Sequence, residues 1–206
     1  MSSVSFIGLG GMARAIAARA VAGGSAVEMI GRDAAKAESV AAALGGGASS
    51  GQFGAVPSGD IVVLAVPYTS AVEVVTRYGE ALAGKVIIDI SNTFTADASG
   101  VLTPDGTSAA QQIAAAAPAD AKIVKAFNTV FGHVLAGDRR LDVLLAGDDM
   151  QAKATVAAFV EGLGLRPLDA GGLAAARWLE AVGPLLMGLA SNGAGFNIAL
   201  GIDVLG

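Results

Sequence analysis

Several residue types are missing or scarce in this chain, and each absence excludes a kind of site. The 206 residues contain no cysteine, which excludes disulfides, thiolate nucleophiles and cysteine-based metal centres. His133 is the single histidine, and one histidine cannot by itself assemble a transition-metal site. We therefore predict that the protein binds no metal.

Charged and aromatic side chains are scarce as well. Charged residues make up 15% of the chain, and acidic ones outnumber basic ones to give a formal net charge of −5. Such a protein repels nucleic acid and acidic membrane surfaces, so we expect neither as a partner. Aromatic residues account for 5% and hydrophobic residues for 53%. This composition excludes disorder and is typical of helices packed on a parallel sheet through small side chains.

Both ends of the chain contain features that indicate the cellular location of the protein. No basic segment precedes the first apolar run, so we expect no signal peptide and a cytoplasmic protein. Residues 183–206 are almost uncharged, which is also typical of a membrane span. Polar residues and a proline interrupt this stretch, namely Pro184, Ser191, Asn192, Asn197 and Asp203. We therefore favour a buried pair of helices over a membrane span.

Short β-branched runs alternate with alanine-rich helical stretches, which indicates an α/β sheet. We expect strands at residues 4–8, 27–30, 61–66, 86–90, 123–126 and 142–146, and a short edge strand at 166–168. We expect helices at residues 12–22, 34–44 after an Asp33 N-cap, 71–82, 109–117, 152–163 and 173–182, the last broken at Pro184. Residues 45–59 are expected to be mostly loop, with a short irregular strand as the alternative, and residues 91–107 to be an irregular connection. The alternation ends near residue 170, so we predict a domain of residues 1–170 and a helical segment of residues 171–206.

The first expected strand runs directly into Gly8-Leu9-Gly10-Gly11-Met12-Ala13, a G-x-G-x-x-A sequence. In such a turn the first glycine permits a tight bend, the second lets the backbone approach a pyrophosphate, and the alanine lets the helix pack closely on the strand. The N–H groups at the helix start then face the phosphates. Because the motif lies between a strand and a helix, we favour dinucleotide binding over a glycine turn selected for packing alone. The predicted fold is a Rossmann-type doubly wound, mostly parallel sheet with a small C-terminal helical extension.

The residues after the second expected strand indicate which dinucleotide the protein binds. An NAD site usually carries an acidic residue there, roughly 20 residues after the turn. This chain has Gly31 and then Arg32 at that place, with Lys36 one helical turn later. A 2′-phosphate brings negative charge that an acid would repel and a guanidinium would bind. We therefore predict a preference for NADP(H). In the alternative, Arg32 and Lys36 only solvate the start of a surface helix.

Polar or turn-forming segments follow three further strands, on the edge where ligands of such sheets bind. They are Ala65-Val66-Pro67-Tyr68, Ser91-Asn92-Thr93 and Lys125-Ala126-Phe127-Asn128-Thr129. Ordinary turn chemistry explains any one of them. Since all three fall on the same edge, we predict that the cofactor cleft is lined by Ala65, Val66, Pro67, Tyr68, Asn92, Ala126 and Asn128.

Asn128 and His133 are the candidates for a direct role in chemistry. His133 follows Asn128 closely in the chain, although a lone histidine is more often an ordinary surface or core residue. No acid/base pair or catalytic triad stands out. That absence is consistent with hydride transfer between two bound cofactors, which needs positioning more than proton chemistry.

The sequence resembles a known family over nearly its whole length, the NADPH-dependent reductases of the deazaflavin coenzyme F-420 (F420), also called F420-dependent NADP oxidoreductases. The likeness is densest in the segments already quoted and in residues 143–180, with Ala146-Gly147-Asp148-Asp149 followed by 164–171 and Leu179-Glu180. The nucleotide domain also resembles that of the STEAP reductases. Ser91-Asn92 and 125–129 are closer to the STEAP version, whose acceptor is a flavin.

The resemblance implies NADPH in the N-terminal fold and a deazaflavin in the cleft against the C-terminal helices, with hydride passing directly between them. It also implies a homodimer that buries the apolar C-terminal helices.

Three functions remain open at this point. The first is an NADPH-dependent reductase of coenzyme F420. The second is an NADPH-dependent reductase of a flavin, a ferric complex or a small carbonyl or imine substrate, with Asn128, Thr129 and His133 at the polar end of the pocket. The third is a non-catalytic NADP(H) sensor that regulates a partner. The sequence leaves the acceptor, the direction and stereochemistry of transfer and the oligomeric state undetermined.

Overall fold

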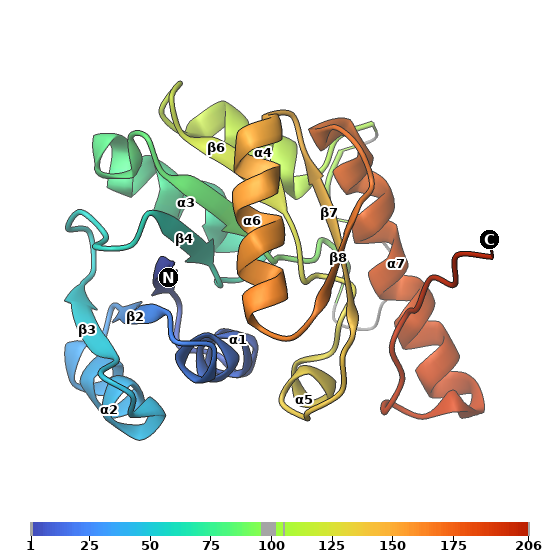
Figure 1. The fold of residues 1–206 in the computed structure, drawn as a ribbon. Helices are drawn as coiled ribbons and strands as arrows, with labels where there is room; N and C mark the ends of the chain where they lie inside the picture. The colour runs from blue at the N-terminus through green and yellow to red at the C-terminus, as the bar shows by residue number, and fades with distance from the viewer. Residues whose placement is uncertain (1, 96–101, 105, 206) are drawn as a thin grey trace.

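The computed structural model describes residues 2–95, 102–104 and 106–205, and its centre is one eight-stranded sheet (Figure 1). The strand order is β3-β2-β1-β4-β5-β6-β7-β8. The six strands from β3 to β6 are parallel, β7 is antiparallel to β6, and β8 is parallel to β7. The strands are β1 (Ser3–Ile7), β2 (Ala26–Gly31), β3 (Ser49–Gln52), β4 (Ile61–Leu64), β5 (Val86–Asp89), β6 (Lys122–Lys125), β7 (Asp142–Gly147) and β8 (Arg166–Asp169). The predicted doubly wound, mostly parallel sheet is confirmed.

Helices cover both faces of the sheet (Figure 1). They are α1 (Gly11–Ala22), α2 (Ala34–Leu44), α3 (Tyr68–Tyr78), α4 (Ala109–Ala116), α5 (Gly132–Leu135), α6 (Met150–Gly162) and α7 (Ala176–Leu189), with short helical turns η1 (Gly79–Leu82), η2 (Leu173–Ala175) and η3 (Ala190–Ala194). Asp33 caps α2 as predicted, because its carboxylate accepts the Lys36 N–H at 3.0 Å.

Two buried clusters form the core, one on each face, because consecutive residues of a strand point to opposite sides. Phe6 of β1 belongs to one cluster, together with Ile16 of α1, Val40 of α2 and Val156 of α6. The next residue, Ile7, belongs to the other cluster, together with Val75 of α3, Ile113 of α4 and Leu179 of α7. Helix α7 therefore packs on the same face as α3 and α4.

The strand order reverses between β1 and β4. From β1 the chain moves outward to β2 and β3, returns to β4 and then continues to β5 and β6. Ile7 is paired with Ile30 of β2 and Leu64 of β4, so the three segments that follow these strands leave the sheet side by side. Ligands of open α/β sheets bind in the crevice at this place.

Two predictions for the C-terminal region were wrong. Helix α7 is not broken at Pro184 but continues to Leu189, since Gly183, Leu186 and Leu179 remain packed in the core on either side of the missing N–H. The expected pair of buried helices in residues 183–206 is also absent. After η3 the described residues 195–205 contain no helix, and their apolar side chains include the exposed Phe196, Val204 and Leu205.

One described helical stretch, Leu173–Ala194, is long and apolar enough to cross a membrane by length and composition alone. A core helix of a soluble protein passes the same test. Part of the predicted irregular stretch 91–107 falls on residues 96–101 and 105, which lie outside the described residues. The division at residue 170 stays a prediction.

Candidate functional site

The turn between β1 and α1 has the shape that its glycines predict. Gly8 has φ +122°, and a Cβ there would lie 2.1 Å from the carbonyl oxygen of Ala65, so a side chain is excluded. Its N–H donates to the carbonyl of Ile30 at 2.9 Å. A Cβ on Gly10 would meet no atom within 4 Å, which means that the backbone there borders open space. Ala13 is 1% exposed, as expected where a helix packs closely against a strand.

The N-terminus of α1 is left without a side-chain cap. Gly10 is its N-cap residue and supplies no side chain. Helices α3, α5 and α7 also begin without a side-chain cap, whereas α2 is capped by Asp33, α4 by Ser108 and α6 by Asp149. The first N–H groups of a helix have no partner within the helix. At α1 they are therefore available to an anion, and the helix dipole adds to the attraction.

A cleft of about 390 Å³ lies along this turn. Most of the residues predicted to bind a cofactor line it, namely Gly8, Leu9, Gly10, Gly31, Arg32, Lys36, Ala65, Val66 and Pro67. It is also lined by Phe53 and Arg77, which sequence reasoning missed. Gly11 and Met12 line a neighbouring groove between α1 and α5 instead.

The residues after β2 make one end of this cleft cationic. Arg32 and Lys36 are both exposed and line the cleft, and neither lies within 4.0 Å of a carboxylate that the structure describes. At Gly31, a Cβ would lie 2.5 Å from Cδ1 of Leu9, so Leu9 fills the space that a side chain at position 31 would need. Arg32 is thus the first side chain after the strand that reaches the cleft. An uncapped helix start followed by two unpaired cations fits a dinucleotide with a further phosphate on its adenosine ribose.

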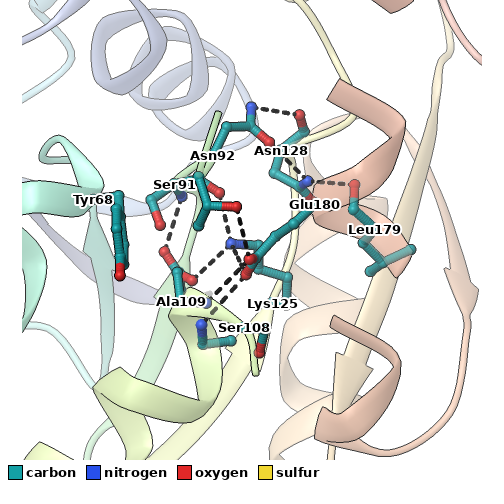
Figure 2. A network of polar contacts seen from close by, with 12 residues as sticks. Tyr68, Ser91, Asn92, Ser108, Ala109, Lys125, Asn128, Leu179 and Glu180 are labelled. Carbon is teal, nitrogen blue, oxygen red and sulfur yellow. Dashed lines mark hydrogen bonds and ion pairs between the residues drawn. The ribbon is translucent and has the colours of Figure 1, made fainter. Parts of the chain in front are cut away.

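Asn92 and Asn128, two of the predicted cleft residues, bind each other after β5 and β6 (Figure 2). The Asn92 amide donates to the backbone carbonyl of Asn128 at 3.0 Å, and the Asn128 amide donates to Oδ1 of Asn92 at 3.1 Å. The Asn128 amide also donates to the carbonyl of Leu179 in α7 at 2.8 Å. Gly183 permits this approach, because a Cβ there would lie 2.5 Å from the Phe94 ring. The two amides therefore join the end of the sheet to α7.

Two buried oxygens beside this pair have no hydrogen-bond partner within the described part of the chain, Oγ of Ser91 and Oδ1 of Asn128. The backbone nearby is also unusual, since Phe127 has φ +61° without being glycine. Unsatisfied buried polar atoms and strained backbone occur preferentially at functional sites. Ser91 and Asn128 thus have buried polar atoms without a partner in the described residues, although neither residue lines the cleft of about 390 Å³.

A buried ion network that sequence reasoning missed lies directly beneath these residues (Figure 2). The ammonium of Lys125 is fully buried and lies 2.8 Å from Oδ2 of Asp89, 2.9 Å from Oε1 of Glu180 and 2.6 Å from the carbonyl of Ser91. Glu180 in turn accepts hydrogen bonds from the Thr93 hydroxyl at 3.2 Å and the Ala109 N–H at 3.0 Å. One cation is therefore shared between two carboxylates, and the N-terminus of α4 stabilises the negative charge that remains.

The remaining predicted residues lie apart from the Asn92–Asn128 pair or contribute only backbone. Tyr68 is the first residue of α3, and its hydroxyl hydrogen-bonds Gln112 at 3.0 Å. Ala126 is fully buried, and its N–H donates to the carbonyl of Asp89. His133 is exposed on the α1–α5 groove, where Nε2 lies 2.8 Å from the carbonyl of Phe196 and the ring stacks on Phe131. His133 thus binds the C-terminal tail in this structure.

Comparisons with known proteins agree with this geometry. A sequence model of the family described as "NADP oxidoreductase coenzyme F420-dependent" matches residues 3–93. The F420-dependent NADP reductase of Methanocaldococcus jannaschii is 32% identical over 158 residues, which cover 70% of each chain. The metalloreductase STEAP3 of Rattus norvegicus is 32% identical over 182 residues, covering 87% of this chain. The matched region spans only 36% of the rat protein.

One solved structure is similar over the whole chain. It is a protein of Arthrobacter sp. FB24 that is provisionally assigned as an F420-dependent NADP reductase. The two chains share 25% identity with a TM-score of 0.86, and the alignment covers 99% of this chain and 100% of the other.

Proposed function

The chain belongs to the family of coenzyme F420-dependent NADP oxidoreductases, and on this premise we propose that it transfers hydride between NADP(H) and coenzyme F420. The observation that carries the proposal is the cleft at the β1–α1 turn. It has an uncapped helix N-terminus and, after β2, cations in place of the acid of an NAD site.

Each part of the cleft has a proposed role in holding the cofactor. Backbone N–H groups of residues 8–12 would bind the pyrophosphate, and Arg32 and Lys36 would bind the 2′-phosphate. Ala65, Val66 and Pro67 would form the wall along which the cofactor crosses β4. Asn92, Asn128 and the backbone at Ala126 would border the nicotinamide, with Tyr68 nearby.

The chemistry that the bound NADPH supplies is a hydride, and an oxidised deazaflavin takes up that hydride together with one proton. The protein's part is to hold two ring systems in contact, which needs no nucleophile or acid/base pair from the chain. The rigid connection of Asn92 and Asn128 to α7 supports this proposal, because it fixes the side of the cleft where the second ring would lie.

A second candidate is reduction of a flavin or a ferric complex. The observation in its favour is the similarity to rat STEAP3, which covers more of this chain than the similarity to the archaeal reductase does. The segments that contain Asn92 and Asn128 would border the acceptor, where the two candidates differ.

Parallel assays with different acceptors test the proposal. The protein is mixed with NADPH and either oxidised F420, flavin mononucleotide, ferric citrate or no acceptor, and the absorbance of NADPH is followed. We expect turnover with F420 and only background rates in the other mixtures. Turnover with flavin or ferric citrate but not with F420 would favour the second candidate. Tight NADPH binding without turnover would indicate a sensor and contradict the proposed enzyme activity.

We also propose a cytoplasmic homodimer joined through α7 and the segment after it. Trp178, Leu185 and Leu189 of α7 are exposed by 63%, 58% and 50%, and Phe196 of the tail by 49%. Apolar side chains exposed in such number usually mark an interface. Sedimentation equilibrium, which gives the mass in solution, tests this part of the proposal.

A further inference from the structure

We propose that Arg77 of α3, held on the ring of Phe53, is a third cation of the site for the adenosine 2′-phosphate. This inference rests on the proposed function, since it concerns the same cofactor. Arg77 lies in the last turn of α3, whereas Arg32 and Lys36 follow β2, and all three line the same cleft. The site would therefore hold the phosphate with side chains from two separate parts of the chain.

Arg77 and Arg32 both lie where two hollows meet. The cleft of about 390 Å³ along the β1–α1 turn and a second, more open hollow of about 710 Å³ beyond β2 and β3 share part of their lining. The shared residues are Gly31, Arg32, Phe53 and Arg77. The two guanidinium groups thus border one continuous space at the end of the cleft that follows β2.

The charge around that space favours an anion. Three cations and two carboxylates, Asp33 and Glu73, line the cleft, whereas the second hollow has Arg32 and Arg77 and no acidic residue in its lining. The Asp33 carboxylate is already engaged as the cap of α2. Within the described residues Arg77 has no carboxylate within 4.0 Å, although Glu73 precedes it by one helical turn. In a chain of net charge −5, unpaired guanidinium groups gathered in this way indicate an anionic ligand.

The Arg77 side chain is held in place before any ligand binds. Its guanidinium carbon lies 5.2 Å from the centroid of the Phe53 ring, a cation–π distance. The Phe53 ring is fixed in turn by an edge-to-face contact with Tyr78, with centroids 5.4 Å apart. Because the Arg77 side chain is already ordered, less conformational entropy is lost when a ligand binds. A planar guanidinium can then offer two parallel N–H groups to phosphate oxygens.

The alternative role for a guanidinium at this place is to stack on the adenine ring of the cofactor. Stacking would act equally on NADPH and NADH, because both contain adenine, whereas a contact to the 2′-phosphate acts on NADPH alone. We assign Arg77 to the 2′-phosphate. A comparison of NADPH with NADH binding therefore separates a phosphate contact from stacking on adenine.

The test measures dissociation constants of NADPH and NADH for the wild-type chain and the variants Arg77→Ala, Arg77→Lys and Phe53→Leu. We expect Arg77→Ala to weaken NADPH binding by about ten- to a hundredfold, the usual effect of losing a charge-assisted hydrogen bond, and to change NADH binding by less than about twofold. Arg77→Lys and Phe53→Leu should weaken NADPH binding less than Arg77→Ala does, since the side chain at position 77 keeps its positive charge in both variants.

Arg139→Ala is the matched control. Arg139 is exposed on the loop before β7 and lines neither hollow, so this variant removes the same charge elsewhere. Equal losses for NADPH and NADH in Arg77→Ala, or no loss, would overturn the inference, as would the same loss in Arg139→Ala. A wild-type chain that does not bind NADPH would instead overturn the proposed function. Thermal unfolding of each variant shows whether the fold is retained.

Discussion

Gly8 and Gly10 belong to one motif but are required for different reasons. Gly8 needs its positive φ and lies against the Ala65 carbonyl, so its role is in the fold. Gly10 has an ordinary backbone conformation, with φ −73°, and borders open space, so its role is toward the ligand. These are the roles that the motif predicts, a tight turn at the first glycine and a close approach of the ligand at the second.

Substitution of each glycine by alanine separates them. We expect Gly8→Ala to lower the free energy of unfolding by about 2–4 kcal/mol through strain and overlap with the β4 end. Gly10→Ala should cost less than about 1 kcal/mol of stability but weaken NADPH binding by about tenfold, because its methyl group stands where the pyrophosphate would approach. Urea unfolding and NADPH titration measure the two effects. A stable Gly8→Ala variant, or a Gly10→Ala variant with unchanged affinity, would contradict this account.

The residue scale also shows what sequence reasoning could reach. Gly8, Gly10, Arg32 and Lys36 follow from a motif with fixed spacing, and the structure places them together in one cleft. Arg77 belongs to the middle of the chain and has no motif of its own. Only the contact of the last turn of α3 with Phe53, which follows β3, brings it to the cleft, so no pattern in the sequence indicates it.

At the scale of elements, the buried network connects three segments that are distant in sequence. Asp89 ends β5, Lys125 ends β6 and Glu180 lies in α7, and the α4 N-terminus contributes N–H groups. A signal was present, since Asp89 and Lys125 each stand among apolar strand residues where a charge needs a partner. Which partner it finds depends on the order of the strands, which the sequence does not state.

Lys125→Met tests the importance of this network. Removing the cation leaves two buried carboxylates without a counter-charge, so the free energy of unfolding should fall by about 3–5 kcal/mol. Lys122→Met, at the half-exposed start of the same strand, should cost less than about 1 kcal/mol. Urea unfolding of both variants provides the comparison. Equal and small losses would show that the network does not hold α7 against the sheet.

Most helices and strands were predictable because each one follows from local spacing. The helix at Ala34–Leu44 and its Asp33 cap agree with the prediction residue by residue, and the other elements predicted before residue 170 overlap the observed ones with ends that differ by a few residues. The short helix α5 was not predicted, and β3 lies in a stretch that was expected to be mostly irregular. The C-terminal region was not predictable in this way. Whether Pro184 breaks a helix depends on the packing around it, and whether residues 195–205 fold into a helix depends on a surface to cover it.

At the scale of the whole molecule, an acidic chain collects positive potential in one place. The net charge is −5, yet Arg32, Lys36 and Arg77 gather at the end of one cleft, beyond an uncapped helix start. The ends of β1, β2 and β4 lie together where the strand order reverses, which places Arg32 and Lys36, and Arg77 reaches the same cleft from the last turn of α3. The proposed preference for a cofactor with an extra phosphate would therefore depend on the sheet topology as much as on any single residue.

Calorimetric titration of the wild-type chain and of Arg32→Ala with NADPH and NADH tests this central claim most directly. The wild-type chain should bind NADPH more tightly than NADH. Arg32→Ala should weaken NADPH binding by about 1.5–3 kcal/mol and barely change NADH binding, because only NADPH carries the phosphate that Arg32 would contact. A wild-type preference for NADH, or equal losses for both cofactors in the variant, would contradict the account.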